Sequence, residues 1–220
     1  MTNRVVLLAG ATGLTGGQLL QLLLNDPDVI CIHALSRKPL KVSHPKLQVH
    51  LVDFRSLGQL PHADEAYLAL GTTIKVAGSK EAFRAVDFEA NMAVAEAAIR
   101  AGVSRIGLVS ASGANARSSV FYTRVKGELE EALRALPLTT LVIARPALLL
   151  DYRAGLGQPV RLGEIISIPI ARLLSPVLPG AYKPVKALAV ARALTQTVPV
   201  TKGIVILSSD QLTERGTVTG

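Results

Sequence analysis

Tyr122 and Lys126 are the two residues whose types and spacing best fit acid–base chemistry. Residues four apart on a helix share a face, so the phenol and the ammonium are predicted to point the same way. A fixed cation beside a phenol favours the phenolate, which lets the phenol exchange a proton with a substrate oxygen near neutral pH. Ser112 is the hydroxyl predicted to hold that oxygen, with Ser110 as the second choice. The same spacing also fits an ordinary exposed helix pair.

A glycine-rich segment near the N-terminus follows an apolar run at residues 5–9 and precedes a helical pattern at residues 14–24. Glycines in this position permit a tight turn, leave room for a diphosphate and let the helix pack closely on the strand. The helix N-terminus adds free N–H groups and a partial positive charge. An ordinary turn is the alternative. The predicted diphosphate-binding residues are Gly10, Thr12, Gly13, Leu14, Thr15 and Gly16.

The end of the second predicted strand carries Arg37 and Lys38 where a carboxylate would favour NAD. A guanidinium can hold a 2′-phosphate with paired, charge-assisted hydrogen bonds, so we expect NADP(H) as the cofactor. A solvated basic turn is the alternative reading of these two residues.

Further cofactor contacts are predicted after the third and fourth strands. Asp53 can accept a hydrogen bond from the adenine amino group, or cap the turn at Ser56. Gly71 would let the backbone approach the cofactor, and Thr72 and Thr73 would bind ribose or phosphate. A plain strand-to-loop turn explains the second group equally well.

The candidate residues are positioned by strands and helices that alternate along the chain. The pattern predicts an α/β fold with a doubly wound, mostly parallel sheet, whose ligands bind beyond the carboxyl ends of the strands. Residues 1–220 are predicted to form one domain, with residues 147–220 as a small, dependent C-terminal lobe on the substrate side. The other predicted strands are 29–35, 47–52, 65–70, 103–110, 138–144 and 204–207, and the other helices are 79–101, 121–136 and 186–198.

Several segments resemble the short-chain dehydrogenase/reductase superfamily in its atypical and extended branches, and within it the Tat-interacting-protein-like oxidoreductases. The resemblance implies a Rossmann fold, NADP(H) binding and a catalytic Ser112, Tyr122 and Lys126. It also implies that Lys126 contacts the nicotinamide ribose and that Pro146 borders the nicotinamide. The resembling segments are 10–16, 35–38, 70–73, 110–114, 122–128 and 145–146.

Two features depart from that pattern. Many extended relatives carry an Asn in the fourth helix where this chain has Val86 and Asp87, although Asn91 lies one turn further on. The interval from Ser112 to Tyr122 is short, so the loop between them must be compact.

Composition limits the partners and the compartment. The net charge is +8, but the Lys and Arg residues are scattered and aromatic residues make up only 4%, so we expect no nucleic-acid partner. The single cysteine, Cys31, excludes an intrachain disulfide and favours a reducing cytoplasm. We expect no membrane span and assign no metal ligands. Apolar residues at 165–178 can pack internally or against a second copy, so the chain is a monomer or a homodimer.

Together these features predict an NADP(H)-dependent oxidoreductase that transfers hydride between nicotinamide and a carbonyl or alcohol carbon of a small-molecule substrate. One alternative is a non-catalytic NADP(H)-binding redox sensor. The other is an enzyme similar to a sugar-nucleotide epimerase, a class that usually has a larger C-terminal lobe.

Overall fold

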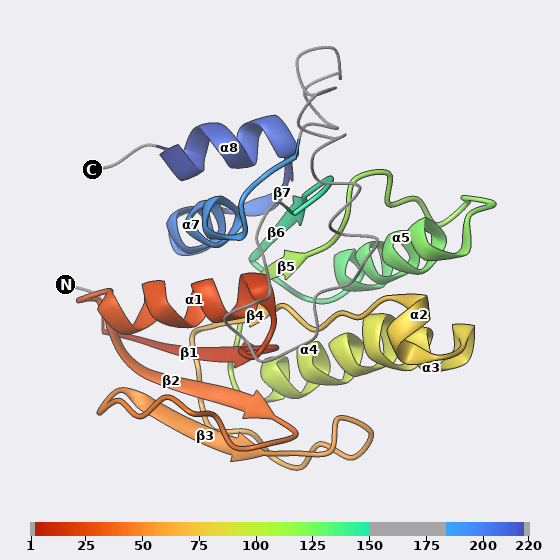
Figure 1. Ribbon diagram of the computed structural model, residues 1–220. Coiled ribbons are helices and arrows are strands. Elements are labelled where there is room, and N and C mark those ends of the chain that lie inside the picture. The colour runs from red at the N-terminus through yellow and green to blue at the C-terminus, as the bar shows by residue number, and fades with distance from the viewer. Residues whose placement is uncertain (1–2, 150–183, 218–220) are drawn as a thin grey trace.

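The computed structural model describes residues 3–149 and 184–217 (Figure 1). Its strands are β1 Arg4–Ala9, β2 Val29–Ser36, β3 Leu47–Leu51, β4 Glu65–Leu68, β5 Arg105–Val109, β6 Thr140–Arg145 and β7 Gly203–Ser208. These strands form one parallel sheet in the order β3-β2-β1-β4-β5-β6-β7. The predicted doubly wound α/β fold is therefore confirmed. The strand order reverses between β1 and β4, which is where such sheets bind ligands.

Helices cover both faces of the sheet. They are α1 Leu14–Asn25, α2 Ile74–Ala77, α3 Lys80–Arg84, the π-helix η1 Ala85–Ala90, α4 Asn91–Arg100, α5 Phe121–Arg134, α7 Ala187–Thr197 and α8 Ser209–Thr217. Successive residues of β1 point into two different cores. Val6 and Leu8 pack with residues of α1 and α7, whereas Leu7 and Ala9 pack with residues of α4 and α5. Burial on both faces explains the continuous apolar run of β1.

The helix predicted at residues 79–101 is interrupted in the structure. Ser79 caps α3 as expected, accepting a hydrogen bond from the Ala82 N–H at 3.0 Å, and α4 is followed by Gly102 with φ +99°. Between them lies η1, a turn wider than an α-helix, and α2 precedes them unpredicted. Apolar residues recur at helical spacing both before and after η1. The sequence pattern therefore predicts one unbroken helix and does not reveal the π-turn within it.

The described part of the C-terminal region joins the main sheet. β7 pairs with β6 and is longer than the predicted strand at 204–207, while α8 was not predicted. The Ser209 hydroxyl accepts a hydrogen bond from the Ala147 N–H at 2.7 Å and fastens the start of α8 to the chain leaving β6. The apolar stretch at 165–178 lies outside the described residues. Among residues 3–149 and 184–217, none of the helices combines the length and the apolar character that spanning a bilayer requires.

A pair of histidines joins β2 to the edge strand β3. The Nδ1 atom of His33 lies 3.0 Å from the Nε2 atom of His50, and His33 is only 7% exposed. Burial, and then repulsion by His50, lowers the pKa of His33. The folded protein therefore favours the neutral imidazole of His33 more than the unfolded chain does.

Acid is expected to destabilise the fold through this histidine. Because the pKa of His33 is lower in the folded than in the unfolded chain, the unfolded chain binds more protons as the pH falls through about 6.5. The free energy of unfolding should then fall, and level off below the folded-state pKa. Urea unfolding across this pH range tests the effect, and His33→Gln should flatten part of the pH slope. An identical slope in the wild type and the variant would contradict it.

Candidate functional site

The turn between β1 and α1 is built from glycines in close contact. Gly10 has φ +94°, and a Cβ atom there would lie 2.4 Å from the carbonyl oxygen of Ala69. A Cβ atom on Gly16 would lie 2.0 Å from the carbonyl oxygen of Gly10. The Gly13 N–H donates to that same oxygen at 2.9 Å. Side chains at Gly10 or Gly16 would therefore force the turn apart.

The N-terminus of α1 fits an anionic group. Gly13 is the residue before the first helical position, and in the described part of the chain no side chain caps the helix there. The Thr15 hydroxyl, in the first turn, is buried and has no hydrogen-bond partner among the described residues. Uncapped backbone N–H groups and a helix dipole favour a phosphate at this position.

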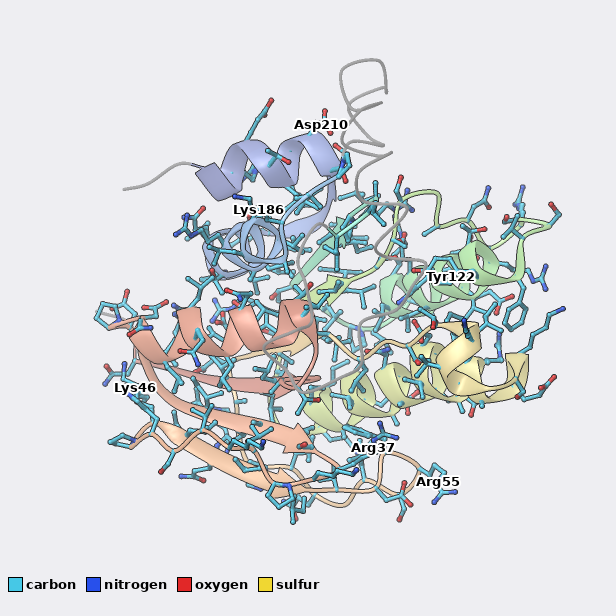
Figure 2. All side chains as sticks on the ribbon, viewed as in Figure 1. Arg37, Lys46, Arg55, Tyr122, Lys186 and Asp210 are labelled. Atoms are coloured by element: carbon cyan, nitrogen blue, oxygen red, sulfur yellow. The ribbon has the colours of Figure 1, made fainter. Side chains whose placement is uncertain are left out.

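A cavity of about 430 Å³ opens beside this turn. It lies among the carboxyl ends of β1, β2 and β4 and the helices α2, α3 and η1, where a ligand of a doubly wound sheet is expected. Seven of the predicted cofactor residues line it: Gly10, Thr12, Gly13, Leu14, Arg37, Gly71 and Thr72. Arg37 follows the end of β2 (Figure 2).

Seven other predicted cofactor residues lie outside the described lining of this cavity, and three of them, Lys38, Thr73 and Asp53, take part in local turns or helix caps. The exposed Lys38 belongs to a turn in which the Ser36 hydroxyl donates to the Lys38 carbonyl oxygen at 2.7 Å. The Thr73 hydroxyl caps α2, accepting a hydrogen bond from the Val76 N–H at 3.3 Å. The third residue is Asp53.

The Asp53 carboxylate shapes its own turn. It accepts hydrogen bonds from the backbone N–H of Arg55 at 3.0 Å and from its guanidinium at 3.0 Å. These hydrogen bonds lower the pKa of Asp53. The Ser56 N–H donates to the Asp53 carbonyl oxygen at 3.0 Å. The carboxylate therefore belongs to a local turn with Arg55, and its contact with adenine stays a prediction.

Lys126 is buried next to the cofactor cavity. Its Nζ atom lies 2.7 Å from Oδ1 of Asp87, and both side chains are at most 5% exposed. A Cβ atom on Gly71 would lie 3.5 Å from the Asp87 carboxylate and 3.8 Å from the Lys126 ammonium. The ion pair therefore lies directly behind the wall of the cavity.

Tyr122 precedes Lys126 by one turn on α5 and is half-buried (Figure 2). Its ring packs against Phe83 of α3 with centroids 5.5 Å apart. Tyr122 thus comes from the same helix face as Lys126 and lies at the contact of α5 with α3. This position beyond the carboxyl end of β5 suits a residue that meets a substrate.

The two candidate serines have different surroundings. The Ser110 hydroxyl is buried and donates to Oε1 of Glu130 at 2.6 Å. Ser112 is half-buried, and its backbone N–H donates to the carbonyl oxygen of Pro146 at 2.8 Å. The contact brings the loop after β5 against the loop after β6, and the contact of Pro146 with nicotinamide stays a prediction. The Ser110 hydroxyl is held by Glu130, and the catalytic role of Ser112 stays a prediction.

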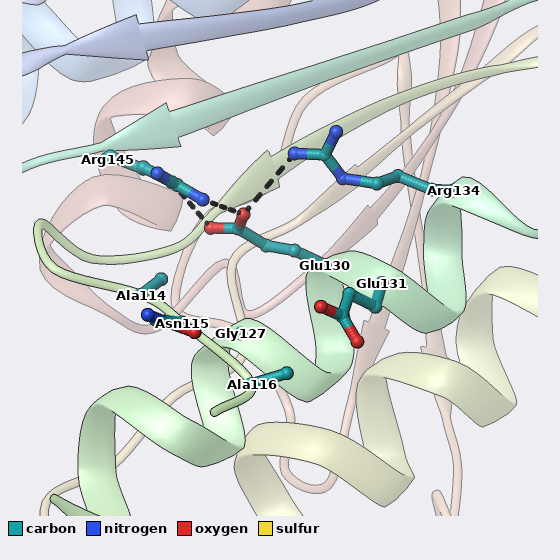
Figure 3. Close-up of a pocket in the computed structure, with 8 residues that line it drawn as sticks. All are labelled: Ala114, Asn115, Ala116, Gly127, Glu130, Glu131, Arg134 and Arg145. Atoms are coloured by element: carbon teal, nitrogen blue, oxygen red, sulfur yellow. Dashed lines mark hydrogen bonds and ion pairs between the residues drawn. The ribbon is translucent and has the colours of Figure 1, made fainter. Parts of the chain in front are cut away.

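Glu130 is a buried residue that sequence reasoning missed. Arg145 donates two hydrogen bonds to it, from Nε at 3.0 Å and Nη2 at 2.5 Å, and Arg134 lies 3.7 Å away. Hydrogen bonding to Glu130 raises the pKa of Arg145. Figure 3 shows this group beside a second cavity of about 350 Å³. Its position in the sequence could have indicated its burial. Glu130 follows Lys126 by one helical turn, so both side chains lie on the same face of α5.

Comparison with known proteins places most of the chain in one family. Residues 10–166 match the model of a family described as NAD(P)H-binding. "Protein fmp52, mitochondrial" of Emericella nidulans is 35% identical over 158 residues, covering 67% of this chain and 68% of that protein. "Protein FMP52, mitochondrial" of Lodderomyces elongisporus is 34% identical over 196 residues, covering 80% and 82%.

These relatives correct the expected compartment. Both are named as mitochondrial proteins, which contradicts the cytoplasmic localisation expected from the sequence. That expectation rested on the single Cys31, which excludes an intrachain disulfide but does not distinguish one reducing compartment from another.

Solved structures share the fold at low sequence identity. MoeE5 in complex with UDP-glucose and NAD has a TM-score of 0.66 at 19% identity, covering 92% of this chain and 74% of that one. The UDP-N-acetylglucosamine 4-epimerase of Methanobrevibacter ruminantium has a TM-score of 0.70 at 14% identity, covering 94% and 77%. At these identities the likeness shows the fold alone.

Proposed function

This chain belongs to the NAD(P)H-binding family, and from that premise we propose that it is an NADP(H)-dependent oxidoreductase acting on a small carbonyl or alcohol substrate. The observation that carries the proposal is the cavity that joins the glycine turn, Arg37 and Thr72 and has Lys126 behind its wall. The alternative interpretations, an ordinary glycine turn and a solvated basic turn at Arg37 and Lys38, would not require these residues to line one cavity. Membership of the Tat-interacting-protein-like subgroup stays a proposal that rests on the sequence resemblance alone, since the relatives reported above carry a different name, FMP52.

The residues of the chain would bind the cofactor and move the proton. Nicotinamide, when bound, supplies or accepts the hydride. The N–H groups after Gly13 would bind the diphosphate, and Lys126 would bind the ribose. Ser112 would donate a hydrogen bond to the substrate oxygen. Tyr122 would give a proton to that oxygen in reduction and take it back in oxidation.

Arg37 is expected to select NADPH over NADH. Arg37→Ala should weaken NADPH binding by about tenfold or more, because a hydrogen-bonded charge pair is worth about 1.5–3 kcal/mol. NADH binding should change by less than about threefold, because NADH has no 2′-phosphate for the guanidinium to hold. Fluorescence titration of both nucleotides measures this.

The matched control is Arg100→Ala, which removes an exposed arginine from the end of α4. This variant should bind both nucleotides as the wild type does. An equal loss of NADPH and NADH affinity in Arg37→Ala would contradict the assignment of Arg37 to the 2′-phosphate. Tight NADPH binding without turnover in a broad carbonyl screen would contradict the oxidoreductase function and favour the redox sensor.

A further inference from the structure

We propose that Asp87 is a positioning residue, which holds Lys126 and Thr72 in the places where they meet the cofactor. Its Oδ1 atom lies 2.7 Å from the Lys126 ammonium, and its Oδ2 atom accepts the Thr72 N–H at 2.8 Å. One carboxylate therefore connects α5 to the loop after β4. The inference rests on the proposed function, because it assigns a purpose to the ion pair behind the cofactor cavity.

The backbone around Asp87 is itself held in place. Asp87 lies in the π-helix η1, and π-turns are frequent at functional sites. The amide of Asn91 donates to the carbonyl oxygens of Leu70 at 3.2 Å, Val86 at 3.3 Å and Asp87 at 3.1 Å. Asn91 thus ties the wide turn to the end of β4. Asp87, noted in the sequence as a departure, and Asn91, one turn further on, are in this way parts of one arrangement.

The sign of the effect separates positioning from simple charge. A buried carboxylate near a dinucleotide repels its phosphates, so if Asp87 contributed only its charge, removing that charge would tighten NADPH binding. If Asp87 positions Lys126, removing the charge releases the ammonium from its place and weakens binding. The two accounts predict opposite changes from the same substitution.

Asp87→Asn is the decisive variant. The amide keeps the size of the side chain and can still accept the Thr72 N–H, but it loses the negative charge. We expect NADPH binding to weaken by about tenfold, the scale of a lost hydrogen bond to a charged group. Glu96→Gln removes an exposed carboxylate from α4 and should leave the affinity unchanged. Fluorescence titration measures the affinity, and thermal melting without nucleotide measures stability separately.

A double-mutant cycle shows whether Asp87 acts through Lys126. In a Lys126→Met background, Asp87→Asn should change NADPH affinity by less than about twofold, because there is no ammonium left to position. If Asp87→Asn alone does not fold, the double variant can still be compared with Lys126→Met, because the double variant buries neither charge. A full further loss in the Lys126→Met background would overturn the inference.

The outcomes separate the inference from the proposed function. A wild type that binds NADPH while Asp87→Asn binds it equally well or more tightly overturns the inference alone. A wild type that binds neither NADPH nor NADH overturns the proposed function, and the inference with it.

Discussion

The Tyr122→Phe variant is expected to lose about 10²- to 10⁴-fold in kcat, the contribution of a general acid–base group. The phenol is on the helix face that carries Lys126, and its ring already packs against Phe83. Phenylalanine keeps that ring contact, so the change removes the hydroxyl without opening a cavity. The loss should appear in the rate of NADPH consumption at saturating substrate, with NADPH affinity within about threefold of the wild type.

A second tyrosine provides the control. Tyr67 is fully buried, and its hydroxyl donates to Oε1 of Glu65 at 3.1 Å, close to Arg4 at the start of β1. Tyr67→Phe removes a phenol hydroxyl away from the cofactor cavity, so kcat per folded molecule should not change, although stability should fall. Unchanged turnover in Tyr122→Phe would remove Tyr122 from the catalytic role.

Gly16→Ala and Gly17→Ala, substitutions at neighbouring positions of α1, are expected to have opposite effects. The new methyl group at Gly16 would lie 2.0 Å from the Gly10 carbonyl oxygen, so α1 must move away from the turn. We expect a loss of about 1–3 kcal/mol in stability and about tenfold or more in NADPH affinity. At Gly17 the nearest atom would be 3.6 Å away. Alanine there should raise stability by about 1 kcal/mol through helix propensity.

Urea unfolding and nucleotide titration of both variants test this contrast. Because each substitution adds one methyl group to the same helix, Gly17→Ala is the matched control for Gly16→Ala. A Gly16→Ala variant that binds NADPH normally would show that close packing of α1 on the turn is not needed for the site.

The alternation of strands and helices and the glycine turn could be predicted because they depend on local signals. Apolar runs of strand length alternate with helical periods, and Gly10, Gly13 and Gly16 stand at the junction of the first strand and helix. The rule that ligands bind at the carboxyl ends of parallel strands then placed Arg37 and Thr72 near that turn. Both residues line the cavity.

Contacts between distant segments could not be predicted from spacing. The sequence marked Asp87 as a departure, but its partner Lys126 belongs to another helix, and the pairing needs the π-turn of η1. Glu130 similarly receives its hydrogen bonds from Ser110 and Arg145, which are brought together by the neighbouring strands β5 and β6. The contact of the Asp53 carboxylate with Arg55 was likewise not among the contacts predicted for it.

The account depends on a diphosphate lying on the backbone N–H groups that follow Gly13, with Arg37 and Lys126 on either side of the cofactor. A crystal structure of the protein with NADPH tests this most directly. The account predicts diphosphate oxygens at the first turn of α1, the 2′-phosphate on the Arg37 guanidinium and the nicotinamide ribose at Lys126. An NADPH molecule bound elsewhere, or a diphosphate away from Gly13, would contradict it.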